Sequence, residues 1–224
     1  MTLIQPPGPG TAAVLDLRLD GVTCLSASVG DFTAELRAAE HAAVRNAVPK
    51  RQREFSTGRW LARQLIAAAT GQACDIPSAA GGRPVWPAGL VGSLAHSDTI
   101  AAAALANRRD IAALGIDIET AHRLTADLHT SVLTVRELRR CAQVDATLFF
   151  SAKEACYKLL NPLTGTFVEF PEIEIDIDLS AQSFSARYRG THAANAIIER
   201  ALGRFGKVSD HWFTAIALPG PTPG

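Results

Sequence analysis

The stretch FFSAKEACYKLL, residues 149–160, combines the apolar spacing of a buried helix with three charged side chains. Glu154 and Lys158 are four residues apart, a spacing that brings two side chains together on one face of a helix. The ordinary interpretation, which includes the neighbouring Lys153, is a surface salt bridge on an amphipathic helix. The alternative is a helix that buries one side as core and presents Lys153, Glu154 and Lys158 to a charged ligand.

The composition indicates a globular protein of 224 residues, with 47% hydrophobic and 20% charged residues. The 22 basic residues balance the 22 acidic ones, which gives no support for general adhesion to nucleic acid or membranes. The four cysteines form no C-x-x-C pair and indicate free thiols in a reducing compartment. The first residues carry no signal-peptide pattern, and the longest apolar run, 100–106, is too short for a membrane span. We therefore expect a cytoplasmic protein.

Hydrophobic periodicity predicts the main helices and strands. Helices are expected at 31–47, at 50–71, near 135–143 and at 149–160. Strands are expected at 12–19, 172–179, 183–190 and 210–218. Residues 99–106 and 112–119 are expected to form a hairpin, with the turn at 107–110.

Two pairs of segments suggest an internal duplication. SDTIAAAAL (97–105) resembles SDHWFTAIAL (209–218), and FSTGRWLARQLI (55–66) resembles FSAKEACYKLLN (150–161). In both pairs the helix precedes the strand. The sequence thus predicts an α+β fold of two similar halves, 1–112 and 113–224, related by pseudo-twofold symmetry. A site in the cleft between the halves is then expected.

The segment GIDIE, 115–119, predicts a strand with two carboxylates on one face. Alternate side chains share a face, so Asp117 and Glu119 point away from Ile116 and Ile118. Such a pair is repulsive unless a cation relieves it. The ordinary interpretation is a solvated strand face; the alternative is a Mg²⁺ site, which Glu154 would complete with a third carboxylate.

Other polar segments each allow more than one interpretation. Ser93 and His96, in GSLAHSD (92–98), suggest a hydrolase pair, a structural histidine or a phosphate contact, but no G-x-S-x-G motif is present. Arg59 and Arg63 are like charges four residues apart, which indicates either a solvated basic face or a bound anion. Arg83, in GGRPVWP, is a further candidate phosphate contact.

Taken in order, GRPVWP, GSLAHS, GIDIE and FSAKEACYK resemble the motifs of Sfp-type 4′-phosphopantetheinyl transferases, particularly the branch serving enterobactin-like siderophore synthetases. The motifs span about residues 50–162. The resemblance implies a monomeric, Mg²⁺-dependent enzyme, with Mn²⁺ as a possible substitute. Its co-substrate would be coenzyme A (CoA), whose 4′-phosphopantetheine arm is transferred to a serine of apo carrier domains of peptide or polyketide synthetases, releasing adenosine 3′,5′-bisphosphate. Two alternatives remain open: a Mg²⁺-dependent hydrolase of CoA or nucleotide pyrophosphates, and a non-catalytic CoA-binding module.

The resemblance also implies roles for individual residues. The expected metal ligands are Asp117, Glu119 and Glu154; the expected catalytic residues are Glu154 as base, with Lys158 and Lys153; the expected CoA contacts are Arg51, Arg59, Arg83, His96 and Lys158. The chain departs from the family pattern at Ala95, where a hydroxyl is usual, and at Phe150, where tryptophan is usual. The first departure removes one phosphate contact, and the second is expected to affect packing.

Overall fold

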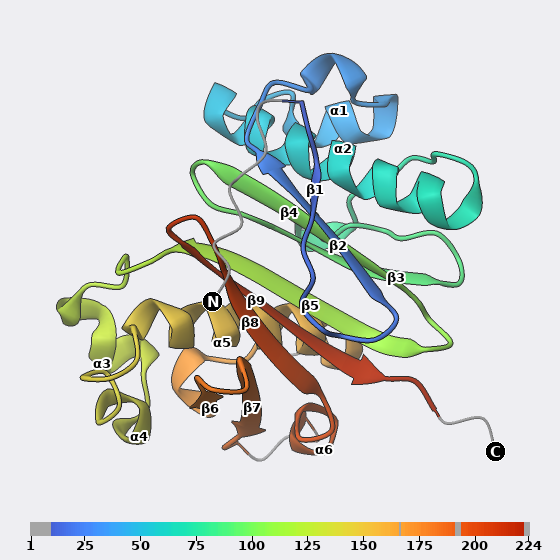
Figure 1. Ribbon diagram of the computed structural model, residues 1–224. Helices are drawn as coiled ribbons and strands as arrows, with labels where there is room; N and C mark the ends of the chain where they lie inside the picture. The colour runs from blue at the N-terminus through green and yellow to red at the C-terminus, as the bar shows by residue number, and fades with distance from the viewer. Residues whose placement is uncertain (1–9, 166, 191–193, 222–224) are drawn as a thin grey trace.

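The computed structural model describes residues 10–165, 167–190 and 194–221, which form two antiparallel sheets flanked by helices (Figure 1). The first sheet has the order β1-β2-β4-β3 and the second β5-β9-β8-β7-β6. The strands of the first sheet are β1 Ala13–Val14, β2 Val22–Ser28, β3 Leu90–His96 and β4 Ile100–Asn107. Those of the second are β5 Ile111–Thr120, β6 Ile173–Asp178, β7 Ser183–Tyr188, β8 Leu202–Val208 and β9 His211–Pro219.

Two long helices and four short ones accompany the sheets in the described residues. They are α1 Ala38–Val44, α2 Pro49–Thr70, α3 His129–Val132, α4 Val135–Leu138, α5 Ala146–Thr164 and α6 Ala194–Ile198. The long helix α2 begins at Pro49 and ends before Gly71, whose φ of 78° suits glycine. The long helix α5 begins after Asp145, whose side chain accepts a hydrogen bond from the backbone N–H of Thr147.

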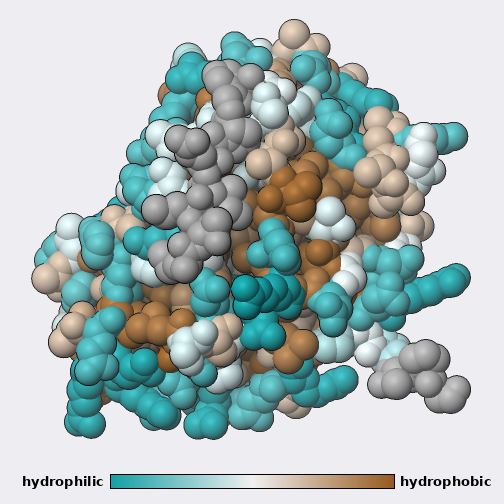
Figure 2. All heavy atoms as spheres, in the orientation of Figure 1, coloured by the Kyte–Doolittle hydropathy of each residue, from teal (hydrophilic) through white to brown (hydrophobic). Residues whose placement is uncertain are grey.

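The elements stack as helix, sheet, sheet, helix. Figure 1 shows α2 above the first sheet and α5 below the second. Leu61 and Ala103 belong to the core between α2 and the first sheet, whereas Ile116 lies in the core between the two sheets. Phe149 and Ile216 belong to the core between the second sheet and α5. Figure 2, in the same orientation, shows that the hydrophobic residues exposed on the viewer's side of the molecule lie mainly over the sheets. The predicted α+β fold is confirmed.

Strand pairing differs from the expected hairpin. Residues of both predicted strands are extended, but β4 pairs with β2 and β3, while β5 pairs with β9. The turn at 107–110 therefore carries the chain from one sheet to the other. The hairpin prediction was wrong because alternation identifies a strand without identifying its partner. Strand 12–19 is also shorter than expected, since only Ala13 and Val14 pair with β2.

The two halves share an arrangement of elements. A short helix and a long helix, α1 and α2, precede the hairpin β3–β4; likewise α4 and α5 precede β8–β9. The order β2-β4-β3 corresponds to β5-β9-β8, and the second half adds the pair β6–β7. The boundary between residues 112 and 113 falls within β5 and stays a prediction, because both sheets contribute to one core. Among the described ranges, no helix is both long and apolar enough for a membrane span.

Candidate active site

A close approach between β5 and α5 builds the centre of the site. The glycine of GIDIE, Gly115, permits it, since a Cβ atom there would overlap the backbone carbonyl of Ala155. Ile116 and Ile118 face the core between the sheets, so Asp117 and Glu119 face α5. The missing side chain thus lets a helix lie directly against two acidic residues.

Asp117 is the most deeply placed carboxylate of this group. It is 4% exposed, and its Oδ1 accepts a hydrogen bond from Nζ of Lys158 at 2.7 Å. Within the described residues, its other oxygen, Oδ2, is buried without a hydrogen-bond partner. A buried carboxylate oxygen without a partner is costly. The interpretation as a solvated strand face does not apply to Asp117.

The three carboxylates repel one another in a poorly solvated space. The pKa of Glu119 is raised to about 7, chiefly by burial and then by the charges of Asp117 and Glu154, while Arg123 and Lys158 oppose the shift. Burial also raises the pKa of Glu154, as does Asp117, while Lys158 lowers it. Every member of the set is an oxygen donor, and the set lacks a counter-charge of equal size. These are the properties of a site for a hard divalent cation.

The carboxylates do not form a ready-made coordination sphere. Within the described part of the chain, no three His, Cys, Asp or Glu side chains converge closely enough to hold a metal ion. Two of the carboxylates pair with cations instead: Asp117 with Lys158 at 2.7 Å, and Glu119 with Arg123 at 3.4 Å. The donor types and the unpartnered oxygen of Asp117 fit a divalent ion, but the expected trio is not preassembled.

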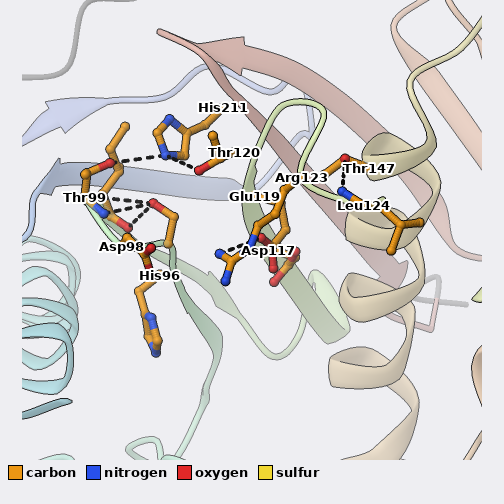
Figure 3. A network of polar contacts seen from close by, with 12 residues as sticks. His96, Asp98, Thr99, Asp117, Glu119, Thr120, Arg123, Leu124, Thr147 and His211 are labelled. Atoms are coloured by element: carbon orange, nitrogen blue, oxygen red, sulfur yellow. Dashed lines mark hydrogen bonds and ion pairs between the residues drawn. The ribbon is translucent and has the colours of Figure 1, made fainter. Parts of the chain in front are cut away.

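His96 is a residue of the first half that lies near the site. It ends β3, and its Nε2 lies 2.5 Å from a guanidinium nitrogen of Arg51, while Nδ1 lies 3.6 Å from Glu54. Burial lowers the pKa of His96, Glu54 opposes this, and the cations Arg51 and Lys158 lower the pKa further. His96 is thus within electrostatic range of Lys158, which pairs with Asp117. Figure 3 shows His96 and Asp117 extending in the same direction from neighbouring strands.

Ser93 does not form a hydrolase pair with His96. The two residues are three positions apart on β3, so their side chains leave opposite faces of the strand. Ser93 is buried, and its Oγ accepts the backbone N–H of Ile116 at 3.1 Å. Its role is to join β3 to β5 across the two halves.

A cavity of 510 Å³ adjoins the site between the halves. Lys158 and Arg83 lie in its wall together with the aromatic rings of Trp86 and Tyr157. The indole of Trp86 packs against Gly92 of β3, where a Cβ atom would lie only 2.7 Å from the ring. Arg83 and Lys158 therefore line the same cavity, and the role of Arg83 as a phosphate contact stays a prediction.

The prediction that Lys153 faces the ligand was wrong. Its side chain is fully buried, and Nζ donates to the backbone carbonyls of Val132 at 2.8 Å and Phe170 at 2.9 Å. The same nitrogen lies 2.8 Å from Glu137. Residue 153 lies about 100° around the helix from residue 154, so it points to the loops behind α5. Lys153 is a structural cation.

The prediction for Arg59 was also wrong. Arg59 is 2% exposed, with Nε donating to the carbonyl of Ile76 and a guanidinium nitrogen to Oγ of Ser78, both at 3.0 Å. Arg63 forms a buried ion pair with Glu40 at 2.6 Å. Neither a solvated basic face nor an anion site describes Arg59 and Arg63, because these two buried arginines of α2 hold their own half together.

Two residues near the site were missed in the sequence. Arg123 follows the predicted strand and pairs with Glu119. Glu54 lies among the basic residues of α2 and faces Arg51 and His96. An acidic residue inside a basic segment was the available signal for Glu54. Arg123 lies in a turn, and no periodic pattern marks it.

Comparisons with known proteins show which family the chain resembles. The family model of the 4′-phosphopantetheinyl transferase N-terminal domain matches residues 39–106, and that of the 4′-phosphopantetheinyl transferase superfamily matches residues 113–215. The chain is 34% identical to 4′-phosphopantetheinyl transferase Svp of Streptomyces mobaraensis over 192 residues, 81% of this chain and 78% of the relative. It is 34% identical to 4′-phosphopantetheinyl transferase Npt of Nocardia iowensis over 161 residues, 69% and 72% of the two chains.

A third relative, 4′-phosphopantetheinyl transferase PptT of Mycobacterium tuberculosis, is 28% identical over 151 residues, 65% of this chain and 66% of its own. The class of protein is therefore an enzyme, a transferase. The chain belongs to the 4′-phosphopantetheinyl transferase family, which transfers phosphopantetheine to carrier proteins. The resemblance to Sfp-type 4′-phosphopantetheinyl transferases is confirmed, whereas the siderophore branch stays a prediction.

Proposed function

We propose that this transferase uses CoA and a divalent ion, Mg²⁺ or alternatively Mn²⁺, held by Asp117, Glu119 and Glu154. The observation that carries the proposal is the buried Oδ2 of Asp117, which lacks a partner within the described residues and lies among carboxylates with raised pKa values. Bound there, the ion would neutralise the CoA pyrophosphate and polarise the phosphorus under attack.

Glu154 is the base of the proposed reaction. It accepts the proton of the carrier serine hydroxyl while the serine oxygen forms a bond to the β-phosphorus of CoA. The bond from that phosphorus to the bridging oxygen breaks, and adenosine 3′,5′-bisphosphate leaves with the electron pair. Burial raises the pKa of Glu154, which moves it toward the range useful for a base at neutral pH.

Cations on both sides of the cleft position the phosphates. Lys158 stabilises the charge that develops on the leaving bisphosphate, and it can exchange its contact with Asp117 for the ligand. His96 and Arg51 approach from the first half, where they would contact the CoA phosphates. Arg83 is assigned to the nucleotide end, since it lines the 510 Å³ cavity together with Lys158. The aromatic wall of that cavity suits the pantetheine arm.

The cellular setting is inferred from the sequence alone. We infer a cytoplasmic monomer that modifies apo carrier domains of peptide or polyketide synthetases, with siderophore synthetases suggested by the enterobactin-like motif order. The neutral net charge is consistent with a protein partner chosen by a local surface rather than by overall attraction.

The test is intact-protein mass spectrometry of apo carrier proteins incubated with the enzyme, CoA and Mg²⁺. The expected result is a mass gain of one phosphopantetheine that disappears with EDTA. Cleavage of CoA without any gain on several carrier types would instead indicate a hydrolase. CoA bound but uncleaved, again without a gain, would indicate a binding module.

A further inference from the structure

His211 is a buried side chain that joins the two halves beside the site. It begins β9 opposite Thr120 of β5 and is 4% exposed. Its Nε2 lies 3.2 Å from Oγ1 of Thr120 and 3.2 Å from Oγ1 of Thr99, which lies in the turn between β3 and β4. One imidazole therefore bridges a turn of the first half and a strand end of the second (Figure 3).

Both ends of this bridge are close in sequence to residues of the proposed site. Thr120 directly follows Glu119 on β5. Thr99 lies in the turn that follows His96, and this turn is held together by Ser97, whose Oγ accepts the backbone N–H of Thr99 at 3.3 Å. A displacement of either threonine would be passed along a short, hydrogen-bonded segment to a side chain in the cleft.

His211 is outside the site itself. Figure 3 shows its ring on the side of Thr99 and Thr120, while the side chains of His96 and Asp117 extend away from it. No contact between the ring and a proposed metal ligand or CoA contact is found within the described residues. Any influence of the ring on transfer must therefore act through the threonines.

The chemistry of the ring suits a fixed cross-link. Nδ1 lies 2.7 Å from Oδ1 of the exposed Asp210, but the geometry is not that of a hydrogen bond. Threonine hydroxyls can donate or accept. The contacts at Nε2 can therefore persist in either protonation state of the ring, which makes His211 a tether rather than a proton carrier.

We propose that His211 is a positioning residue for phosphopantetheine transfer. Through Thr99 and Thr120 it sets the spacing across the cleft between His96 and Glu119. The proposal rests on the proposed function, which assigns His96 to the CoA phosphates and Glu119 to the metal ion. A displacement of about 1 Å from a remote mutation can lower a rate about 10²-fold. We expect a smaller effect here, about tenfold, because Ser93 also joins the halves.

The principal variants are His211→Phe and His211→Gln. Phenylalanine fills the volume of the ring but removes both contacts, whereas the glutamine amide can reach the position of Nε2. For His211→Phe we expect about a tenfold lower kcat/KM for CoA, weaker CoA binding by calorimetry and a higher Mg²⁺ concentration for half-maximal rate. The KM for the carrier protein should not change. His211→Gln should restore most of the rate and of the CoA affinity.

Threonine variants test the same bridge even where His211→Phe fails to fold. Thr99→Val keeps the shape of the side chain and should reproduce the weaker CoA binding, and Thr23→Val, at an exposed threonine of β2, is the matched control. In a folded double variant, Thr99→Val should add little to His211→Phe.

Two results would overturn the inference while leaving the proposed function intact. One is a folded His211→Phe or Thr99→Val variant with wild-type CoA affinity and Mg²⁺ requirement. The other is a His211→Gln variant as impaired as His211→Phe. An inactive wild-type enzyme, in contrast, would count against the proposed function itself.

Discussion

The strands β2 and β5 occupy corresponding places in the two halves but differ in chemistry. On β5, Asp117 pairs with Thr214 of β9, and Glu119 pairs with Trp212; both carboxylates face the long helix α5. On β2, Leu25 pairs with Ala103 of β4, and Ala27 pairs with Ala101; all four belong to the apolar cluster under α2. The same arrangement of strands and helix thus serves as a scaffold in one half and a reactive site in the other.

A buried glutamate is common to both halves. Glu40 accepts the backbone N–H of Ile76 at 3.0 Å and pairs with Arg63 of α2 at 2.6 Å. Glu137 accepts the N–H of Ile175 at 2.7 Å and pairs with Lys153 of α5 at 2.8 Å. In each half the glutamate also caps its own short helix. A cation on the long helix is therefore structural where it meets this glutamate, and available for chemistry where it meets the cleft.

The largest effect is expected at Glu154. Glu154→Gln removes the proposed base and one metal ligand, so the transfer rate should fall by about 10³-fold or more. The melting temperature should not fall, since a partly buried charge is removed. The matched control from the other half is Arg59→Gln, at the position aligned with Glu154. It should lower stability but keep the rate of the folded enzyme within a few-fold of wild type. Transfer measured by mass spectrometry at a near-normal rate in Glu154→Gln would contradict the assignment.

The buried ion pairs of the two halves should contribute equally to the stability of the fold. Arg63→Met and Lys153→Met each leave a buried glutamate charge unpaired, so the free energy of unfolding should fall by about 3–5 kcal/mol. Urea titration followed by circular dichroism measures this.

Two further variants isolate the cause. Adding Glu137→Gln to Lys153→Met should recover part of the loss, because the unpaired charge is removed. Lys158→Met should lower transfer while costing far less stability, since the Lys158 side chain is 29% exposed. Equal destabilisation by Lys153→Met and Lys158→Met would show that the two lysines were wrongly separated.

Two glycines offer a smaller contrast. Gly115→Ala should lower the free energy of unfolding by about 3 kcal/mol, because the new methyl group meets the backbone of α5. Gly58→Ala should raise it by about 1 kcal/mol, because nothing lies within 4 Å of the new Cβ and alanine favours the helix. Chemical denaturation of both variants measures these changes. An unchanged free energy of unfolding in Gly115→Ala would show that β5 and α5 can move apart without loss of stability.

The smallest effect is a pH dependence from Glu119. Its pKa is raised from 4.5 to about 7 in the folded state, so the folded protein binds the proton more tightly than the unfolded chain. This group therefore stabilises the fold below pH 4.5, and its contribution is lost as the pH rises to about 7. Glu119→Gln removes the dependence. Without metal, its melting temperature should exceed that of wild type by a few degrees at pH 8 and by less at pH 5.

The response to Mg²⁺ tests whether Glu119 is a metal ligand. Addition of Mg²⁺ at pH 8 should raise the melting temperature of wild type more than that of Glu119→Gln, because a ligand stabilises the state that binds it. The corresponding Ala27→Ser variant in the first half should respond to Mg²⁺ as wild type does. An equal rise in melting temperature for wild type and Glu119→Gln would show that Glu119 is not a metal ligand.

Local sequence was sufficient for the elements with strong periodicity. The helix at 50–71 and the strands at 172–179, 183–190 and 210–218 were predicted within a few residues. Strand β8 was missed because Gly203 and Gly206 interrupt its alternation. The helix at 31–47 is broken, with a short 3-10 turn before α1, and α1 begins only at Ala38.

The acidic residues of the site could also be found from the sequence, because their chemistry depends on close neighbours. Asp117 and Glu119 share a strand face, and Glu154 and Lys158 share a helix face; both follow from local geometry. Only the tertiary structure decided which strands pair, which way Lys153 and Arg59 point, and that His211 joins the halves. In each of these cases the partner lies far along the chain, and no periodicity within a helix or strand records a contact that folding alone creates.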